Sequence, residues 1–167
     1  MFNINELVVY GNTGLCVVSD IGALEMDTAD KSKTYYTLTP MTQNNSHIYA
    51  PVDSSKIVLR KINSESQCKE LVNNIPCIKP GQVTFEKDRE KYYRTTIRSC
   101  DLTDIVSLIK LLYIKRIQCE EQGKKLNNTD KNYLALAENA LFSELTTVLD
   151  INEDDVKRLI NEHLKVA

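Results

Sequence analysis

The chain has 167 residues, of which 42% are hydrophobic and 26% charged, so it can form one ordinary domain or two small ones with buried cores. No apolar run approaches the length of a membrane span, and the first residues lack the basic start and apolar stretch of a secretory signal peptide, which favours a cytoplasmic protein. The formal net charge of −2 by itself argues against a strong nucleic-acid binder.

Charge is unevenly distributed along the chain. Residues 80–126 carry ten basic and seven acidic side chains, a net charge of +3, whereas residues 127–167 carry four and eight, a net charge of −4. Residues 1–62 are close to neutral, at −1. Any anion-binding surface is therefore expected in the middle stretch.

The first 62 residues predict a small β module. Runs at 7–10 and 15–18 flank the turn residues Gly11–Gly14 and predict a hairpin, and three more short runs lie at 35–38, 48–50 and 57–59. Polar stretches at 27–33 and 42–46 predict loops. Five short strands in so few residues predict a strongly bent sheet or barrel of the SH3 or Tudor type.

After Ile62 the pattern changes to helix. Ser64 with Gln67 forms a capping-box signature, and Pro76 ends the short helix that follows. Residues 86–99 form a second predicted helix, and three more are expected to begin at Asp101 or Thr103, at Thr129, and at Asn152. The predicted class is α+β, with a β module over 1–62 followed by an all-α bundle over 63–167.

The inner faces of the last three helices follow from helical periodicity. Each carries one apolar stripe, which we expect to form the core of the bundle. The three stripes are Ile105, Leu108, Ile109 and Leu112; Leu134, Ala137, Leu141, Leu145 and Val148; and Val156, Leu159, Ile160 and Leu164.

Residues suited to catalysis or metal binding are few. The two histidines, His47 and His163, have no partner at metal-ligand spacing, and no nucleotide-binding loop or nucleophile elbow is present. The five cysteines are odd in number and without a C-x-x-C pair, which favours reduced and mostly buried thiols over disulfides or zinc. Cys16, within a strand's apolar run, is expected to be a core thiol. An enzyme is the disfavoured class, and no cofactor is predicted.

A cationic stripe is the most informative pattern. Lys87, Lys91, Arg94 and Arg98 are spaced by 4, 3 and 4 residues, which places them on one face of an α-helix. Like charges at this spacing cost about 0.2–0.5 kcal/mol per pair, which either Glu90, four residues before Arg94, or a bound phosphate backbone can offset. The alternative is a solvated face on which acidic residues alternate with the cations.

Two aromatic features accompany the stripe. Tyr92 and Tyr93 either stack on bases or anchor the helix to its bundle through their rings. Anchoring is the more common role of such tyrosines, and on an α-helix Phe85, Tyr92 and Thr96 would lie near the face opposite the cations.

The chain resembles the CarD/CdnL family, and in its first half the related polymerase-binding domain of transcription-repair coupling factors. The resembling segments are Val8-Val9-Tyr10 with Gly14 and Val18, Tyr35-Tyr36-x-Leu38, Ala50-Pro51-Val52, Arg60, Ser99-Cys100-Asp101-Leu102, and the run from Leu126 to Ala137. Their order and spacing over nearly the whole chain carry the resemblance, rather than any single motif.

The resemblance implies a Tudor-like module that docks on the β subunit of RNA polymerase by strand addition at a sheet edge. We expect residues 1–62 alone to bind that subunit, and a proline at Ile48 or Ala50 to weaken binding by deleting a backbone donor. The matching strand is His47, Ile48, Tyr49, Ala50 and Pro51.

The resemblance further implies that the helical domain contacts promoter DNA with little sequence preference and stabilises the open complex. The expected protein is a monomer, and the alternative is a protein–protein adaptor on the polymerase that touches no DNA. The residues expected at the DNA are Phe85, Lys87, Arg89, Lys91, Arg94, Arg98, Lys125 and Lys131.

The sequence departs from the family pattern in three places. Better-known members place a tryptophan before the cationic helix, where it wedges into the minor groove, and this chain has none. Phe85 occupies the corresponding place in chain order, so it is either the wedge or a core residue beneath the helix. Cys100 replaces the usual glycine before Asp101, and polymerase-facing arginines of some members fall near Leu24 and Tyr49.

Overall fold

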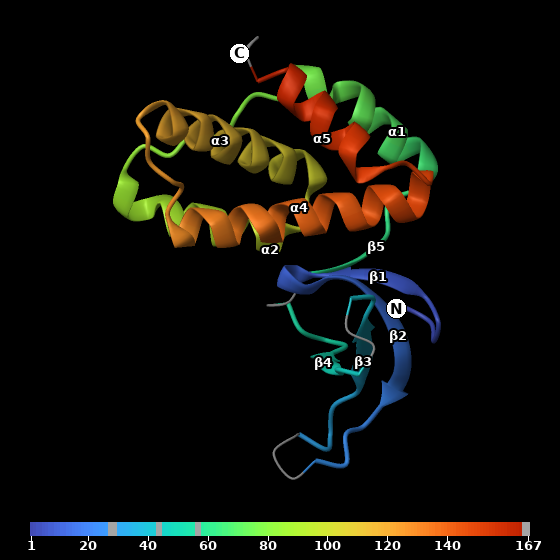
Figure 1. Ribbon diagram of the computed structural model, residues 1–167. Coiled ribbons are helices and arrows are strands. Elements are labelled where there is room, and N and C mark those ends of the chain that lie inside the picture. The colour runs from blue at the N-terminus through green and yellow to red at the C-terminus, as the bar shows by residue number, and fades with distance from the viewer. Residues whose placement is uncertain (27–29, 43–44, 56–57, 165–167) are drawn as a thin grey trace. The chain divides into compact units, whose positions relative to one another are not determined.

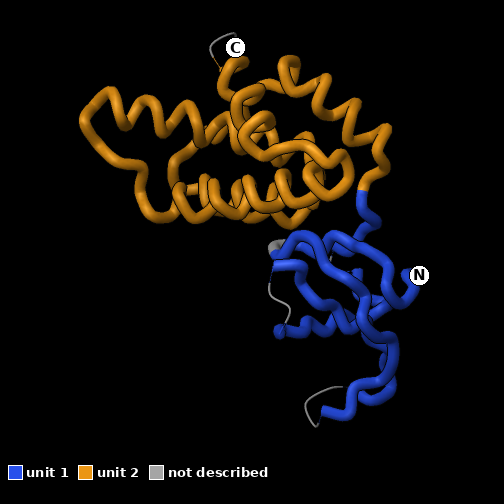
Figure 2. The backbone as a smooth tube through the Cα atoms, turned by 45° about the vertical axis from the view of Figure 1, so that its right-hand side comes forward, with its two compact units in different colours: residues 1–62 blue, residues 63–167 orange. Residues whose placement is uncertain are grey.

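The computed structural model describes residues 1–26, 30–42, 45–55 and 58–164. The chain divides into two compact units, residues 1–62 and 63–167 (Figure 2). The first holds a five-stranded antiparallel sheet and the second is helical (Figure 1), which confirms the predicted α+β class. Within the described residues, no helix is both long enough and apolar enough to cross a membrane.

The sheet of the first unit has the strand order β4-β3-β2-β1-β5. The predicted hairpin is confirmed, because β1 and β2 pair with Val8 opposite Cys16 across a single 3-10 turn at Gly11–Thr13. A register shift between Val18 and Asp20 interrupts the ladder to β3, as a bulge that bends a strand does. The strands are β1 (Leu7–Tyr10), β2 (Gly14–Gly22), β3 (Tyr35–Pro40), β4 (Ile48–Pro51) and β5 (Leu59–Lys61).

One face of this sheet forms an apolar core. Along β3, Tyr36 and Leu38 are buried and their neighbours are not, which is the period of two of a strand with one face in the core. The core consists of Val8, Cys16, Val18, Tyr36, Leu38 and Ala50.

Two details of the β module differ from the sequence prediction. The last strand begins at Leu59 rather than at Ile57, and Ile57 lies outside the described residues. The predicted loops at 27–33 and 42–46 are turns or coil in their described parts, whereas residues 27–29 and 43–44 lie outside them.

Four of the five described α-helices of the second unit begin at side-chain caps, and the helix at Arg89–Ser99 is the exception. Ser64 and Gln67 form the predicted capping box, and Asp101 and Asn152 cap the helices that follow them. The start of the helix that was expected at Thr129 was predicted two residues late, because Asn127 is its cap and accepts a hydrogen bond from Asp130 N–H. The helices are α1 (Glu65–Asn74), α2 (Arg89–Ser99), α3 (Leu102–Glu121), α4 (Asn128–Leu149) and α5 (Glu153–Glu162).

Helix α3 lies at the centre of this unit. All four members of its predicted apolar stripe are at most 1% exposed, and they pack with the buried face of α4. The stripes of α4 and α5 are confirmed as well, with Val148 and Leu159 only partly buried at the margin of the core. Burying these stripes together stabilises the helices, because most helical stability in proteins comes from tertiary packing of an apolar face.

Cys100 closes α2 in a left-handed conformation. Its φ is 57°, a region that glycine enters without steric cost, and its side chain is 2% exposed. The thiol is therefore accommodated in the core at a backbone position where the family resemblance predicts glycine. Asp101 follows it as the cap of α3, so the helix start is unchanged by the substitution.

Candidate functional site

The edge strand β4 carries the residues predicted to meet the polymerase. Among the described strands, β4 pairs only with β3. Val52 N–H donates to the Thr34 carbonyl at 2.9 Å, and by the alternation of an antiparallel ladder Ile48 and Ala50 direct their backbone groups toward β3 as well. Tyr49 then directs its N–H and C=O away from the sheet, toward any added strand.

This register corrects the expectation about proline. A proline at Ile48 or Ala50 would delete a donor of the protein's own ladder, so it would disrupt β4 itself. Tyr49 is the position where a proline removes an outward donor and leaves the pairing with β3 intact. The backbone of Pro51 also faces away from β3, but proline has no N–H. Its carbonyl already accepts from Ser54 N–H at 3.2 Å.

Four of the five predicted side chains of this edge separate into two groups, and Pro51 is partly buried. Tyr49 is 40% exposed and His47 is exposed, with its Nδ1 3.3 Å from Thr39 Oγ1. Ala50 is 1% exposed and belongs to the core, and Ile48 packs against that core. The outer surface of the edge therefore consists of Tyr49, His47 and backbone groups.

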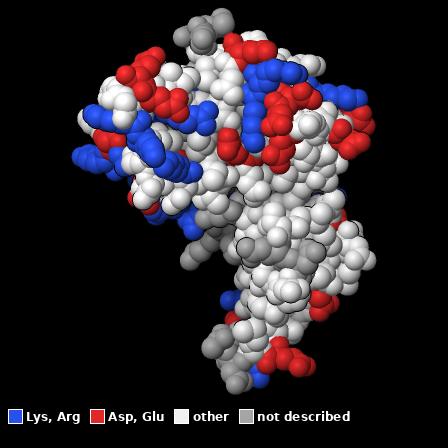
Figure 3. Space-filling model, viewed as in Figure 1, with Lys and Arg blue, Asp and Glu red and all other residues white. Residues whose placement is uncertain are grey.

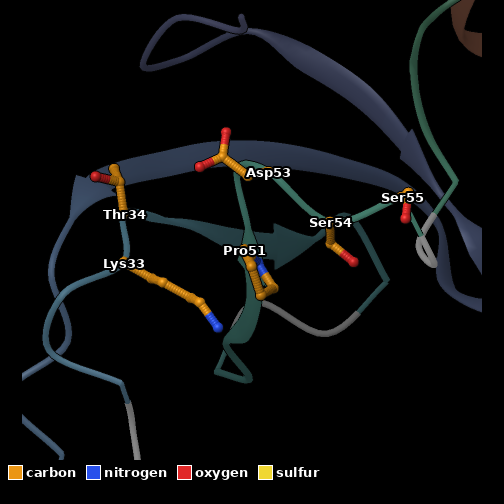
Figure 4. Close-up of a pocket in the computed structure, with 6 residues that line it drawn as sticks. All are labelled: Lys33, Thr34, Pro51, Asp53, Ser54 and Ser55. Carbon is orange, nitrogen blue, oxygen red and sulfur yellow. The ribbon is translucent and has the colours of Figure 1, made fainter.

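A pocket lies at the end of β4 (Figure 4). It has a volume of about 220 Å³, and around Pro51 its polar lining comes from Lys33, Thr34, Asp53, Ser54 and Ser55. Lys33 is paired with Asp30 at 3.2 Å. The pocket continues the edge of the sheet and is large enough for one side chain of a docked segment.

Helix α2 confirms most of the predicted stripe. Lys91, Arg94 and Arg98 are exposed along one face, and Tyr93, Thr96 and Ile97 are buried on the other, as the spacing predicted for Thr96. Lys87 is also exposed, but it lies in the 3-10 turn η3 (Glu86–Asp88) before the helix. Glu90 does pair with Arg94, at 3.0 Å. Tyr93 anchors the helix, with its ring 5.5 Å from that of Tyr133.

Phe85 is exposed rather than buried. The expectation that it packs under the helix as a core residue is wrong, because 59% of its surface is accessible. The reason is that α2 begins only at Arg89, so Phe85 precedes the amphipathic segment and does not share its buried face. The Lys87 ammonium lies 5.6 Å from the centre of the Phe85 ring.

Arg89 lies in an ionic cluster and is only 26% exposed. Its guanidinium pairs with Glu86 and lies 3.5 Å from Asp130 Oδ1, while Lys115 Nζ lies 2.8 Å from Asp130 Oδ2 and 3.1 Å from Glu86 Oε1. Lys115, together with Arg89, holds the pKa of the Glu86 carboxyl below its usual range. Because two carboxylates already engage Arg89, it is less available to phosphate than its exposed neighbours. We call these four residues the ionic cluster.

Lys125 and Lys131 lie at the connection between α3 and α4. Both are exposed, and with Arg116 and Lys124 they surround a hollow of about 320 Å³ that has Leu126 and Leu134 in its lining. Figure 3 shows Lys and Arg side chains gathered at this end of the helical unit, with acidic side chains among them. The ionic cluster joins the start of α2 to the same end.

The cysteines and carboxylates do not form a chemical centre in the described part of the chain, where no three His, Cys, Asp or Glu side chains gather as metal ligands would. Cys16, Cys68 and Cys100 are buried, Cys119 is half-buried and Cys77 is exposed. Burial raises the pKa of the Cys16 thiol to about 11, so it is protonated at neutral pH and is a poor nucleophile.

Sequence reasoning missed Lys115 and Asp130 as partners of the cationic segment. They are 15 residues apart on two helices, and each has an ordinary helical context in the sequence. One signal was present: Asp130 stands three residues after Asn127, and Asn127 Nδ2 does donate to Asp130 Oδ2 at 2.8 Å. That spacing predicts a capped helix start, but it does not predict which cations face it.

Comparison with known protein families covers both units. The family model described as the CarD-like/TRCF RID domain matches residues 2–63, and the model described as the CarD C-terminal domain matches residues 81–161. A search of curated proteins found no significant match. The two matches follow each other in the family's order and include the edge strand β4, the cationic helix α2 and the α3–α4 connection. The chain therefore belongs to the CarD-like family of non-enzymatic transcription regulators that interact with RNA polymerase.

Proposed function

We propose that the protein binds the β subunit of RNA polymerase through β4 and stabilises the promoter open complex through its helical unit. It acts as a monomer in this proposal. The observation that carries the DNA part is Phe85, an aromatic side chain that is 59% exposed and whose ring centre lies 5.6 Å from the ammonium of the exposed Lys87. An exposed aromatic beside cations is suited to partial insertion between base steps next to a phosphate backbone.

The edge strand supports the polymerase contact. Tyr49 offers one outward donor and one outward acceptor, as strand addition requires, and its exposed ring adds a side-chain anchor. The pocket lined by Lys33 and Asp53 would receive a side chain of the partner strand beyond Pro51.

The exposed cations support DNA contact through phosphates. Lys91 and Arg98 have no carboxylate partner among the described residues, and Lys125 and Lys131 add positive charge at the α3–α4 connection. Each phosphate that a cation neutralises releases counterions, so we expect affinity to fall linearly in a plot of log affinity against log salt. Such contacts fix position and carry little sequence information.

The direct test reverses charge on the stripe of the full-length protein. Lys91→Glu combined with Arg94→Glu is expected to shorten the lifetime of open complexes challenged with heparin, while capture of polymerase stays unchanged. The matched control is Lys157→Glu with Arg158→Glu, which makes the same change of charge on α5.

The outcome separates the proposal from its alternative. A shorter open-complex lifetime with the α2 variant, but not with the α5 control, would support DNA contact by the helical unit. An unchanged lifetime with full polymerase binding would contradict DNA contact and favour an adaptor whose cationic stripe is merely solvated.

A further inference from the structure

The ionic cluster joins three segments that are distant in sequence. Glu86 belongs to η3, Arg89 to the first turn of α2, Lys115 to α3 and Asp130 to the first turn of α4. Two carboxylates and two cations make the cluster neutral, so it adds nothing to the net charge of this end of the unit. Its effect on a partner must therefore be geometric.

Asp130 is the fixed member of the cluster. It is 0% exposed, and its backbone N–H donates to Asn127 Oδ1 at 2.8 Å as part of the cap of α4. A carboxylate in the first turn of a helix is further stabilised by the helix dipole. A buried charge held in this way has no freedom to reorient, so cations bound to it are held in one place.

Glu86 is the peripheral member, and it directly follows Phe85. Its side chain is 66% exposed and reaches inward only through Lys115 and Arg89. Asp88 N–H donates to the Phe85 carbonyl at 2.9 Å, which joins Phe85 to the same short turn. The backbone of Phe85 is thus fixed on its C-terminal side by the cluster.

A second attachment fixes the chain on the N-terminal side of Phe85. Gly81 N–H donates to the Ser107 carbonyl at 2.9 Å, and Ser107 Oγ donates to the Lys79 carbonyl at 2.8 Å. A Cβ at Gly81 would lie 2.4 Å from the hydroxyl oxygen of Tyr92, so a larger residue here would displace the Tyr92 side chain. Only residues 82–85 lie between the two attachments.

We infer that the ionic cluster is a positioning device that holds Phe85 outward for insertion into promoter DNA, with Glu86 as the positioning residue that connects them. The inference rests on the proposed function. An exposed phenyl ring in a free loop samples many orientations, and ordering it on binding would reduce affinity. A preformed turn removes most of that loss before the DNA is met.

The absence of tryptophan from the chain provides a reporter. Phe85→Trp introduces the sole indole, and its time-resolved fluorescence anisotropy measures how tightly the segment is held in the free protein. Adding Glu86→Gln is expected to cause loss of the residual anisotropy, with fast local motion in its place. Adding Asp88→Asn is the matched control, because Asp88 is an exposed neighbour with the same charge and forms no side-chain ion pair in the described structure.

The functional arm measures open-complex lifetime in the otherwise native chain. Glu86→Gln is expected to lose most of the stabilisation that depends on Phe85, and to have no further effect when combined with Phe85→Ala. Asp88→Asn removes the same charge near the DNA and is expected to preserve or lengthen the lifetime. A merely structural role for Glu86 would shorten the lifetime equally with and without Phe85.

The proposed function and the positioning inference would be overturned by different results. If Phe85→Ala leaves the lifetime unchanged, the wedge role in the proposed function is wrong, and the positioning inference falls with it. If Phe85→Ala shortens the lifetime but Glu86→Gln does not, or if the indole keeps its anisotropy in Glu86→Gln, only the positioning inference is overturned.

Discussion

The two units bury different kinds of side chain. In the described part of residues 1–62 no buried side chain is charged, and the core is a layer of apolar residues on one face of the sheet. The helical unit buries Lys110, Asp130 and Glu144, each at most 1% exposed. The described β unit is therefore built around an apolar core, whereas the helical unit has charged side chains both in its interior and on its surface.

Lys110 shows what a buried charge does in the helical unit. Its Nζ donates to the carbonyls of Ile75 and Ile78 at 2.6 and 2.8 Å, where α1 and the following 3-10 turn η2 (Ile75–Cys77) end. Burial lowers the pKa of this amine, and the two carbonyls offset part of the cost of desolvation. Polar groups that end a helix inside the unit are thereby satisfied.

The largest expected loss of stability comes from Asp130→Ala, which removes one of the buried charges that distinguish the helical unit from the β unit. Breaking a buried ion pair leaves Lys115 and Arg89 without their inner partner, and we expect a loss of about 3 kcal/mol in the free energy of unfolding of the helical unit. Amide hydrogen exchange followed by NMR measures both units at once, and the β unit should keep its protection.

The control for that variant is Asp155→Ala, which removes an exposed pair with Arg158 and should cost less than about 0.5 kcal/mol. Equal losses from the two substitutions would show that burial of Asp130 is not what stabilises the unit.

The second effect concerns the backbone edge of the β unit. Tyr49→Pro removes one outward donor, and we expect polymerase affinity to fall by about 1 kcal/mol, or roughly fivefold, with the unit still folded. Tyr49→Ala separates the ring from the backbone, and Ile48→Pro should unfold the edge. Calorimetry of binding together with circular dichroism measures both quantities, and unaltered affinity in folded Tyr49→Pro protein would exclude strand addition at this edge.

A third effect concerns the exposed cations of the helical unit. Lys125→Ala is expected to reduce the slope of log DNA affinity against log salt by about 0.9, the contribution of one phosphate contact. Lys157→Ala, which removes a cation that lies 3.6 Å from Glu153, should leave the slope unchanged. Equal slopes for both variants and the native protein would show that Lys125 does not contact a DNA phosphate.

The smallest expected effect on stability belongs to Phe85→Ala. Because the ring is largely exposed, the free energy of unfolding should change by less than about 0.5 kcal/mol, measured by chemical denaturation. A loss of about 3 kcal/mol would mean that the ring is packed as a core residue after all.

The two units were predictable from sequence to different degrees. Short apolar and β-branched runs between turn residues identified the strands. Helical periodicity and capping residues identified four of the helix faces and the cap at Asp101, because all these signals depend on residues close together in the chain. The outward phase of Tyr49 depends on pairing with β3, and the sequestration of Arg89 depends on Asp130, forty-one residues away. Such contacts are set by tertiary packing, which local patterns do not encode.

In the proposed function, an exposed aromatic of the helical unit stabilises the open promoter while the β unit holds the polymerase. The decisive measurement is the lifetime of heparin-challenged open complexes with Phe85→Ala protein at equal polymerase occupancy. We expect the lifetime to fall toward that of polymerase alone with no change in polymerase affinity or melting temperature. A native lifetime supported by the folded variant would contradict the claim.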